Sequence, residues 1–124
     1  MRRGRIVIEP RRAAREAELP ALRGLCDDTK FIPDGEALFI HLSKLRFDCC
    51  GAVHICDALL SPYEVAALGG YTTRLLLETQ PPKAGLNWAT VTALGNQWHT
   101  WSWQGIPSDW AIIEILSNHL KALA

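Results

Sequence analysis

The sequence predicts one α+β domain, made of an N-terminal helix, an antiparallel meander of three to four strands, a Trp-rich irregular segment and a C-terminal helix. Apolar stretches bounded by turn residues recur in the first part of the chain, as strands do. The closing residues carry apolar side chains at helical spacing. A length of 124 residues, with 48% hydrophobic and 21% charged residues, suits a single domain over residues 1–124.

The first elements are a strand or arm and a helix. Residues 5–9 (RIVIE) are rich in β-branched side chains, and Pro10 ends this stretch. Residues 1–10 are therefore expected to form a basic N-terminal arm or an edge strand. Residues 11–25 are rich in Ala, Arg, Glu and Leu, which favour a helix. Pro20 interrupts this stretch and predicts a kink or two short helices. Residues 27–35 contain Pro, Asp and Gly and indicate a turn-rich link.

Three strands are expected next, at residues 37–47, 52–60 and 71–79. Their connections are too short for helical crossovers, with room for a short helix only at residues 63–68. An antiparallel meander is therefore the economical topology.

The segment 81–105 is predicted to be irregular. All five tryptophans lie in the last third of the chain, and four of them fall within this segment. A long irregular segment inside a compact domain is usually either functional or firmly packed. The density of aromatic side chains favours packing.

The C-terminal helix has the clearest pattern. Ser108 or Asp109 is the expected N-cap, because a side-chain oxygen there accepts free backbone N–H groups. Apolar or weakly polar side chains then recur on one helical face, at Ile112, Leu116, His119, Leu120 and Leu123.

This order of elements resembles the ubiquitin-conjugating (E2) fold, and more closely the divergent prokaryotic E2-like (UBC-like) family. The similarity covers roughly residues 11–124. It is carried by residues 38–60, by GYTTRLLLETQPP at 70–82, by GLNW at 85–88, and by NQWHTWSWQGIPSDW at 96–110 with the helix that follows. The resemblance implies a component of a bacterial ubiquitin-like modifier pathway. Its expected partners are a ubiquitin-like modifier, an activating enzyme or another E2-like protein.

The chain also departs from that family. E2 enzymes carry the modifier on a cysteine after the meander, and here no cysteine follows Cys56. The family's His-Pro-Asn element is absent, and Thr72 replaces the proline of a Tyr-Pro pair. The resemblance therefore implies a protein-binding component without thioester activity of its own, in which Tyr71, Trp98, Trp101 and Trp103 are candidate partner contacts. The competing interpretation of each ring is burial in the core.

A relocated nucleophile is the enzyme alternative, in which the chain is an active E2-type modifier carrier. Cys49, Cys50 and Cys56 are the candidate thiols, and His54 lies two residues from Cys56, on the same face of a strand. The competing interpretation of Cys56 is a small buried core residue.

His99 is a candidate acid–base residue with Asp109 or Ser102, against the interpretation of a packed histidine. His119 lies on the apolar helix face, which indicates a structural role, and His41 lies on a predicted strand without an identifiable partner.

No metal site or cofactor is expected. Cys49, Cys50, His54 and Cys56 lie within eight residues but lack the two separated pairs typical of structural zinc. The adjacent pair of cysteines does not resemble a secreted disulfide framework, so reduced thiols in a cytosol are expected.

The charge is balanced overall but not locally. The formal net charge is zero, yet residues 1–15 hold six arginines and one glutamate, a net charge of +5. A second alternative function is therefore an arginine arm that binds nucleic acid or an acidic protein. No aromatic residue lies among the arginines for base stacking, which favours a solvated arm and makes nucleic acid an unexpected partner. The sequence has no apolar run near the ~18 residues of a membrane span and no signal peptide, which predicts a cytoplasmic protein.

Overall fold

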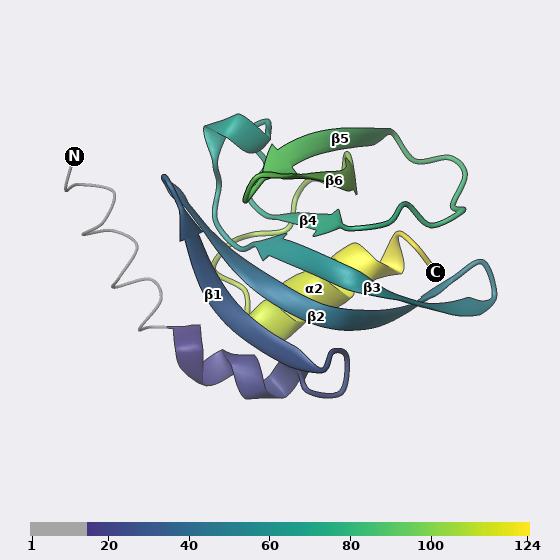
Figure 1. Ribbon diagram of the computed structural model, residues 1–124, viewed down its shortest axis with the longest axis horizontal. Coiled ribbons are helices and arrows are strands. Elements are labelled where there is room, and N and C mark those ends of the chain that lie inside the picture. Colours follow the sequence, from purple (N-terminus) through teal and green to yellow (C-terminus); the bar gives the residue numbers. More distant parts are fainter. Residues whose placement is uncertain (1–14) are drawn as a thin grey trace.

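Two long strands joined by a two-residue turn form the centre of the molecule. β2 (Ala37–Cys49) and β3 (Ala52–Ser61) pair antiparallel across Cys50 and Gly51, whose φ angles are 55° and 82°. Positive φ at both positions is the geometry of a type I′ turn, whose twist matches that of the paired strands. The computed structural model describes residues 15–124 (Figure 1).

Four shorter strands complete a six-stranded antiparallel sheet with the order β1-β2-β3-β4-β6-β5. They are β1 (Asp28–Asp34), β4 (Arg74–Leu77), β5 (Trp88–Ala93) and β6 (Asn96–Trp101). β2, β3 and β4 form the predicted meander, and β1 adds a strand at its edge. The β5–β6 hairpin then joins through β6, which pairs with β4 at Leu77 and His99.

Two of the sequence predictions for this region are wrong. The expected link at residues 27–35 is mostly β1, an edge strand that buries only Phe31. The expected irregular segment at residues 81–105 contains β5 and β6. Both strands of β5–β6 and most of β1 are half exposed, so they lack the continuous apolar run that marks a buried strand.

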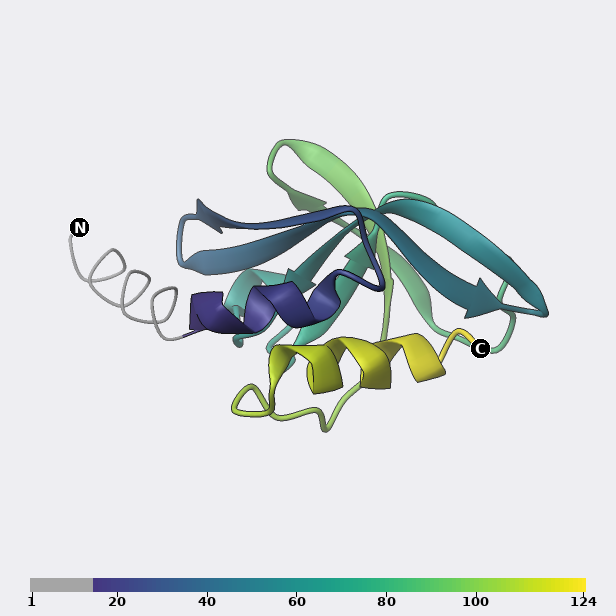
Figure 2. The ribbon, with the colours of Figure 1, turned by 90° about the horizontal axis from the view of Figure 1, so that it is seen from below.

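The helices cover one face of the sheet. η1 (Glu16–Leu22) is a seven-residue 3-10 helix that contains Pro20, so the two helices or kink expected at Pro20 are replaced by one short helix. α2 (Ile112–Lys121) confirms the predicted C-terminal helix, and η2 (Ala66–Leu68) is a single turn between β3 and β4. Figure 2 shows η1 and α2 lying on the same side of the sheet. We call this side the inner face.

The inner core lies between the sheet and these helices. The largest side chain fully buried there is Trp101, whose ring lies 5.2 Å from that of Trp88 and 6.4 Å from that of His119. Leucine and isoleucine side chains from β2, β4 and α2 surround it, among them Leu42, Leu77 and Ile115.

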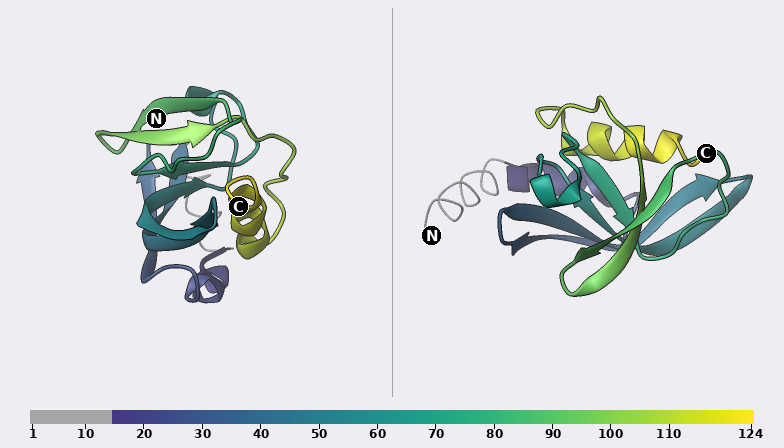
Figure 3. Two further views of the ribbon diagram at one scale, coloured as in Figure 1. Left: turned by 90° about the vertical axis from the view of Figure 1, so that its right-hand side faces the viewer. Right: turned by 90° about the horizontal axis from the view of Figure 1, so that it is seen from above.

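A smaller core lies on the opposite, outer face. The β5–β6 hairpin bends away from the helices (Figure 3), and Trp98 packs against Phe39, Leu59 and Leu76. The hairpin covers only one end of the outer face, because β6 contacts β4 at a single register pair. The other end, formed by the distal halves of β2 and β3, is left open.

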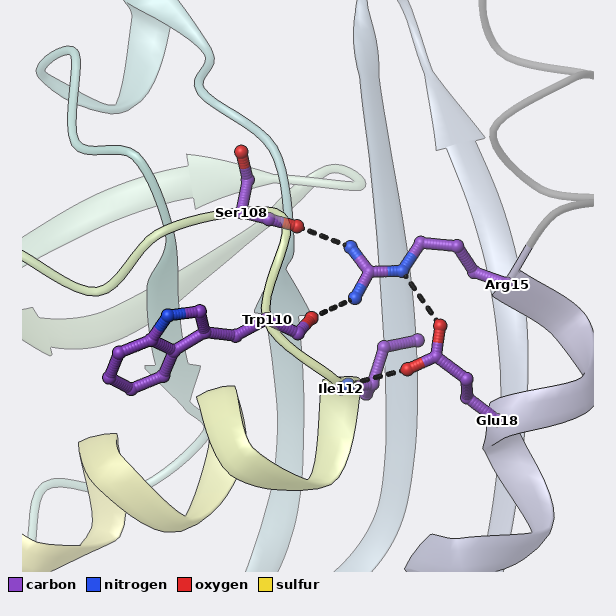
Figure 4. Close-up of polar contacts among 5 residues, drawn as sticks. All are labelled: Arg15, Glu18, Ser108, Trp110 and Ile112. Atoms are coloured by element: carbon purple, nitrogen blue, oxygen red, sulfur yellow. Dashed lines mark hydrogen bonds and ion pairs between the residues drawn. The ribbon is translucent and has the colours of Figure 1, made fainter.

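The two helices are joined by a polar clamp (Figure 4). The buried Arg15 guanidinium donates hydrogen bonds to the carbonyl oxygens of Ser108, at 2.6 Å, and Trp110, and to the carboxylate of Glu18 at 3.0 Å. Glu18 in turn accepts a hydrogen bond of 2.7 Å from the backbone N–H of Ile112.

Glu18 therefore caps α2, and the predicted N-cap at Ser108 or Asp109 is wrong. Those residues lie in a turn before the helix, whereas the N-cap position is Ala111, which has no side-chain oxygen. Of the arginines in the predicted basic arm, Arg15 has a structural role. The others lie outside the described residues, as does the strand or arm expected at residues 5–9.

Candidate functional site

The open end of the outer face exposes two large apolar side chains. Val53 and Ile55 are 66% and 58% exposed, and they alternate on β3 with residues that face the inner core. Their partners across β2 are Asp48 and Arg46. Among the described residues the exposed large apolar side chains are Val53, Ile55 and Trp110, and the first two are neighbours on one strand face.

The same strand face leads directly into a polar cleft. The cleft has a volume of about 430 Å³. Its floor is formed by three side chains from adjacent strands, His41 on β2, Asp57 on β3 and Glu78 just beyond β4. The β5–β6 hairpin supplies the wall, through Leu94, Asn96, Gln97 and Trp98.

The carboxylate of Asp57 is fixed in the cleft by two contacts. Its carboxylate accepts a hydrogen bond of 2.9 Å from the backbone N–H of Lys44 and lies 3.6 Å from Nε2 of His41. Lys44 is at a bulge between Leu42 and Leu45, with φ of 52°, which turns its N–H toward the carboxylate. Glu78 is exposed and lies beside Asp57, to which it is linked by a backbone hydrogen bond of 2.9 Å.

The arrangement of these groups favours binding of a cation. The cleft presents two carboxylates, that of Asp57, which is held by hydrogen bonding, and that of the exposed Glu78, with His41 beside Asp57. None of the described residues that line it is a Ser, Thr, Cys, Tyr or Lys that might act as a covalent nucleophile.

A second concavity meets this surface at Val53. It has a volume of about 590 Å³ and lies between the end of α2 and the distal part of β2, where Leu25, Phe47 and Leu120 form much of its lining. Val53 lines this concavity, whereas Asp57, four residues further along β3, lines the polar cleft.

The predicted tryptophan contacts divide between the two cores. Trp98 is buried on the outer face and donates its indole N–H to the carbonyl of Ala93 at 3.0 Å. Trp101 and the half-buried Trp103 both pack on the inner core, as the alternation around Ser102 predicts. Trp98 and Trp101 thus follow the core interpretation, and neither ring is accessible in this structure.

Tyr71 holds a buried cation. Its half-exposed ring lies under the guanidinium of Arg74, 4.2 Å from the ring centroid, and its hydroxyl bonds to Ser102 at 2.9 Å. The hydrogen bond with Ser102 and the positive charge of the nearby Arg74 lower the pKa of Tyr71. Arg74 also bonds to Thr100 and to the carbonyl of Leu68, so this cluster fastens the loop around η2 to the sheet.

The cysteines differ in exposure. Cys26 and Cys49 are buried, Cys56 is half-buried, and Cys50 is exposed in the turn. Burial raises the pKa of the Cys26, Cys49 and Cys56 thiols, which disfavours the nucleophilic thiolate. Within residues 15–124 no hydrogen bond joins a cysteine to a histidine, and the ring of His54 stacks on Phe47 instead.

The acid–base pair expected for His99 is not formed. Its Nδ1 atom is buried and has no hydrogen-bond partner among the described residues, while Ser102 bonds to Tyr71. The cluster of Cys49, Cys50, His54 and Cys56 does not converge, and residues 15–124 hold no group of three His, Cys, Asp or Glu side chains arranged for a metal ion.

Sequence reasoning missed the cleft. Of its lining residues the sequence singled out His41 and Trp98, whereas Asp57 and Glu78 come to the cleft through strand pairing. The one available signal was the period-two alternation of Val53, Ile55 and Asp57, which places two apolar residues and an acid on one face.

Fold and site together define an α+β protein with an open, partly apolar strand face beside an acidic cleft. Comparison with protein-family models, with curated proteins and with solved structures finds no match to this chain. Among the helices of residues 15–124, none has the length and apolar character to cross a membrane.

Proposed function

We propose that this protein is a protein-binding module whose contact surface is the outer face of β3 together with the adjoining cleft. The observation that carries the proposal is the pair of exposed side chains Val53 and Ile55, on the same strand face as Asp57. Water contact with two aliphatic side chains costs free energy, and a partner that covers them recovers it, at about 25 cal/mol per Å² of apolar area.

The cleft defines the chemistry of the partner. The carboxylates of Asp57 and Glu78 favour a Lys or Arg side chain, which can donate to both while its stem lies along the Asn96 and Gln97 side of the cleft. The proposed partner is therefore a polypeptide that presents a basic residue beside apolar ones. The apolar residues cover β3 and the basic residue enters the cleft.

The pathway rests on the sequence resemblance. The order of helix, meander, Trp-rich segment and closing helix supports a UBC-like role, and the missing cysteine after the meander supports a binding role over a carrier role. On this proposal the partner is a ubiquitin-like modifier, its activating enzyme or another E2-like protein.

The test compares a double substitution on β3 with a control substitution on β5. A partner captured from the protein's own cells is identified, purified and titrated against wild type, Val53→Asp/Ile55→Asp, and Ala89→Asp as a control on the exposed strand β5. We expect the double substitution to weaken the affinity at least about 100-fold, as for residues at the centre of an interface, and Ala89→Asp to leave it within about twofold.

A second titration tests the cleft. Asp57→Asn/Glu78→Gln removes both charges and should weaken binding about tenfold, with an effect that shrinks as salt is added. Equal affinity for wild type and the β3 double variant would rule out the proposed surface. A captured partner unrelated to modifier conjugation would leave the surface in place and remove the pathway.

The carrier alternative has one observation in its favour, the exposed thiol of Cys50. If the chain is a carrier, incubation with activating enzyme, modifier and ATP should give a thiol-sensitive adduct that Cys50→Ser abolishes. Absence of that adduct removes the alternative.

A further inference from the structure

The turn between β2 and β3 contains two cysteines in contact. The Sγ atoms of Cys49 and Cys50 are 3.6 Å apart. Cys49 is fully buried in the inner core, whereas Cys50 is exposed and directs its thiol toward the carbonyl oxygen of Pro82, at 3.4 Å. One thiol is thus accessible to a reagent from solution, and the other lies directly behind it.

The backbone at Cys50 gives a second observation. Its φ angle is 55°, in the left-handed region, at the first central position of a type I′ turn. That position favours Asn, Asp or Gly, because other side chains are strained there. A cysteine at this strained position gains nothing for the turn, and strained residues of this kind tend to cluster at functional sites.

We propose that Cys49 and Cys50 form a dithiol modification site, which small disulfides of the glutathione class oxidise to a disulfide between these adjacent residues. This inference is independent of the proposed protein-binding function and uses none of its residues.

The reaction has two exchange steps. The thiolate of Cys50 attacks one sulfur of the small disulfide, so that a mixed disulfide forms and one small thiolate leaves with the electron pair of the broken bond. The thiol of Cys49 then loses its proton and attacks the Cys50 sulfur, which expels the second small thiolate. One small disulfide is reduced to two thiols, and two protein thiols become one disulfide.

The surroundings assign the two roles. Burial raises the pKa of the Cys49 thiol, which disfavours its reaction with a reagent from solution, and the positive charge of Lys83 opposes this effect. Contact with the Cys50 sulfur is what makes Cys49 the resolving thiol. The exposed Cys50 meets the reagent first because access governs thiol exchange.

The product is expected to be labile. Adjacent Cα atoms are about 3.8 Å apart across a trans peptide, below the usual ~4.4–6.8 Å of disulfides, so the ring is strained. Strained disulfides are readily reduced, which is typical of regulatory rather than structural bonds.

The test uses the full chain, reduced and then incubated with oxidised glutathione, with intact masses followed over time. Wild type should lose the mass of two hydrogen atoms through a transient glutathione adduct and recover with dithiothreitol. Cys49→Ser should stop at the adduct on Cys50. Cys50→Ser should react at least about tenfold more slowly, because its remaining thiols are shielded.

Cys56→Ser is the matched control, since Cys56 is the other cysteine of the β2–β3 ribbon, and it should behave as wild type. Circular dichroism of each reduced variant checks the fold. A wild-type adduct that never resolves, an absence of reaction, or a loss of hydrogens that requires Cys56 would each overturn the proposal. If Cys49→Ser does not fold, wild type and Cys56→Ser still decide the outcome.

Discussion

The two faces of the sheet differ in how completely they are covered. On the inner face, η1 and α2 bury Trp101, His119 and the leucines of the central strands. On the outer face, the β5–β6 hairpin buries only the half near Phe39 and Trp98, and it leaves Val53 and Ile55 in water. Buried side chains on the inner face should therefore contribute to stability, and exposed ones on the outer face should contribute little. Substitutions on each face can test this difference.

The largest expected effect is on the inner face. Trp101→Ala removes the largest fully buried side chain and leaves a cavity, so the free energy of unfolding should fall by about 4 kcal/mol. Urea unfolding followed by circular dichroism measures the change. A loss below about 1 kcal/mol would mean that the inner core does not depend on this ring.

The next effect is on pH dependence. Burial lowers the pKa of His119 to about 4, while Thr73 bonds to its Nε2 at 2.9 Å. The ring is therefore neutral in the fold and takes up a proton on unfolding below pH ~6.5. Its contribution is complete above pH ~6.5 and is lost as the pH falls toward 4, by about 3 kcal/mol in total. His119→Leu should flatten this part of the curve, and an unchanged slope in the variant would contradict the assignment.

A smaller effect is expected at the clamp. Glu18→Gln removes the charge that faces Arg15 and the first turn of α2, and should cost about 1 kcal/mol. Glu16→Gln, an exposed acid in the same short helix, is the control and should cost close to nothing. Equal losses for the two variants in thermal unfolding would argue against a specific clamp.

The smallest effect is expected on the open half of the outer face. Val53→Thr and Ile55→Thr keep β-branched side chains on an exposed strand, so each should change the free energy of unfolding by less than about 0.5 kcal/mol. The same urea experiment measures it. A loss as large as that of Trp101→Ala would show that the outer face is covered after all.

Local sequence patterns predicted part of this fold. Residues 37–47 and 52–60 were predictable because dense apolar side chains end at a Cys-Gly turn, and α2 because Ile112, Leu116 and Leu123 share one helical face. β1 and β5 were missed because edge strands bury few side chains, and β6 because its buried residues do not form a continuous apolar run. The turn at Leu94 and Gly95 also lacks the Asn-Gly signal, although both residues have positive φ.

The site was less predictable than the fold. His41, Asp57 and Glu78 are far apart in sequence and meet only through the register of β2, β3 and β4. The capping of α2 by Glu18 is equally non-local, since helix signals near residue 108 are visible but a carboxylate 94 residues away is not.

That clamp has a consequence for synthesis of the chain on the ribosome. Translation proceeds at about 5–20 residues per second, so roughly 5–20 s separate the appearance of Glu18 from that of Ile112. Throughout this interval the apolar sides of η1 and the early strands lack the helix that shields them. The nascent polypeptide therefore exposes these apolar side chains for longer than a protein whose neighbouring segments pair as they emerge.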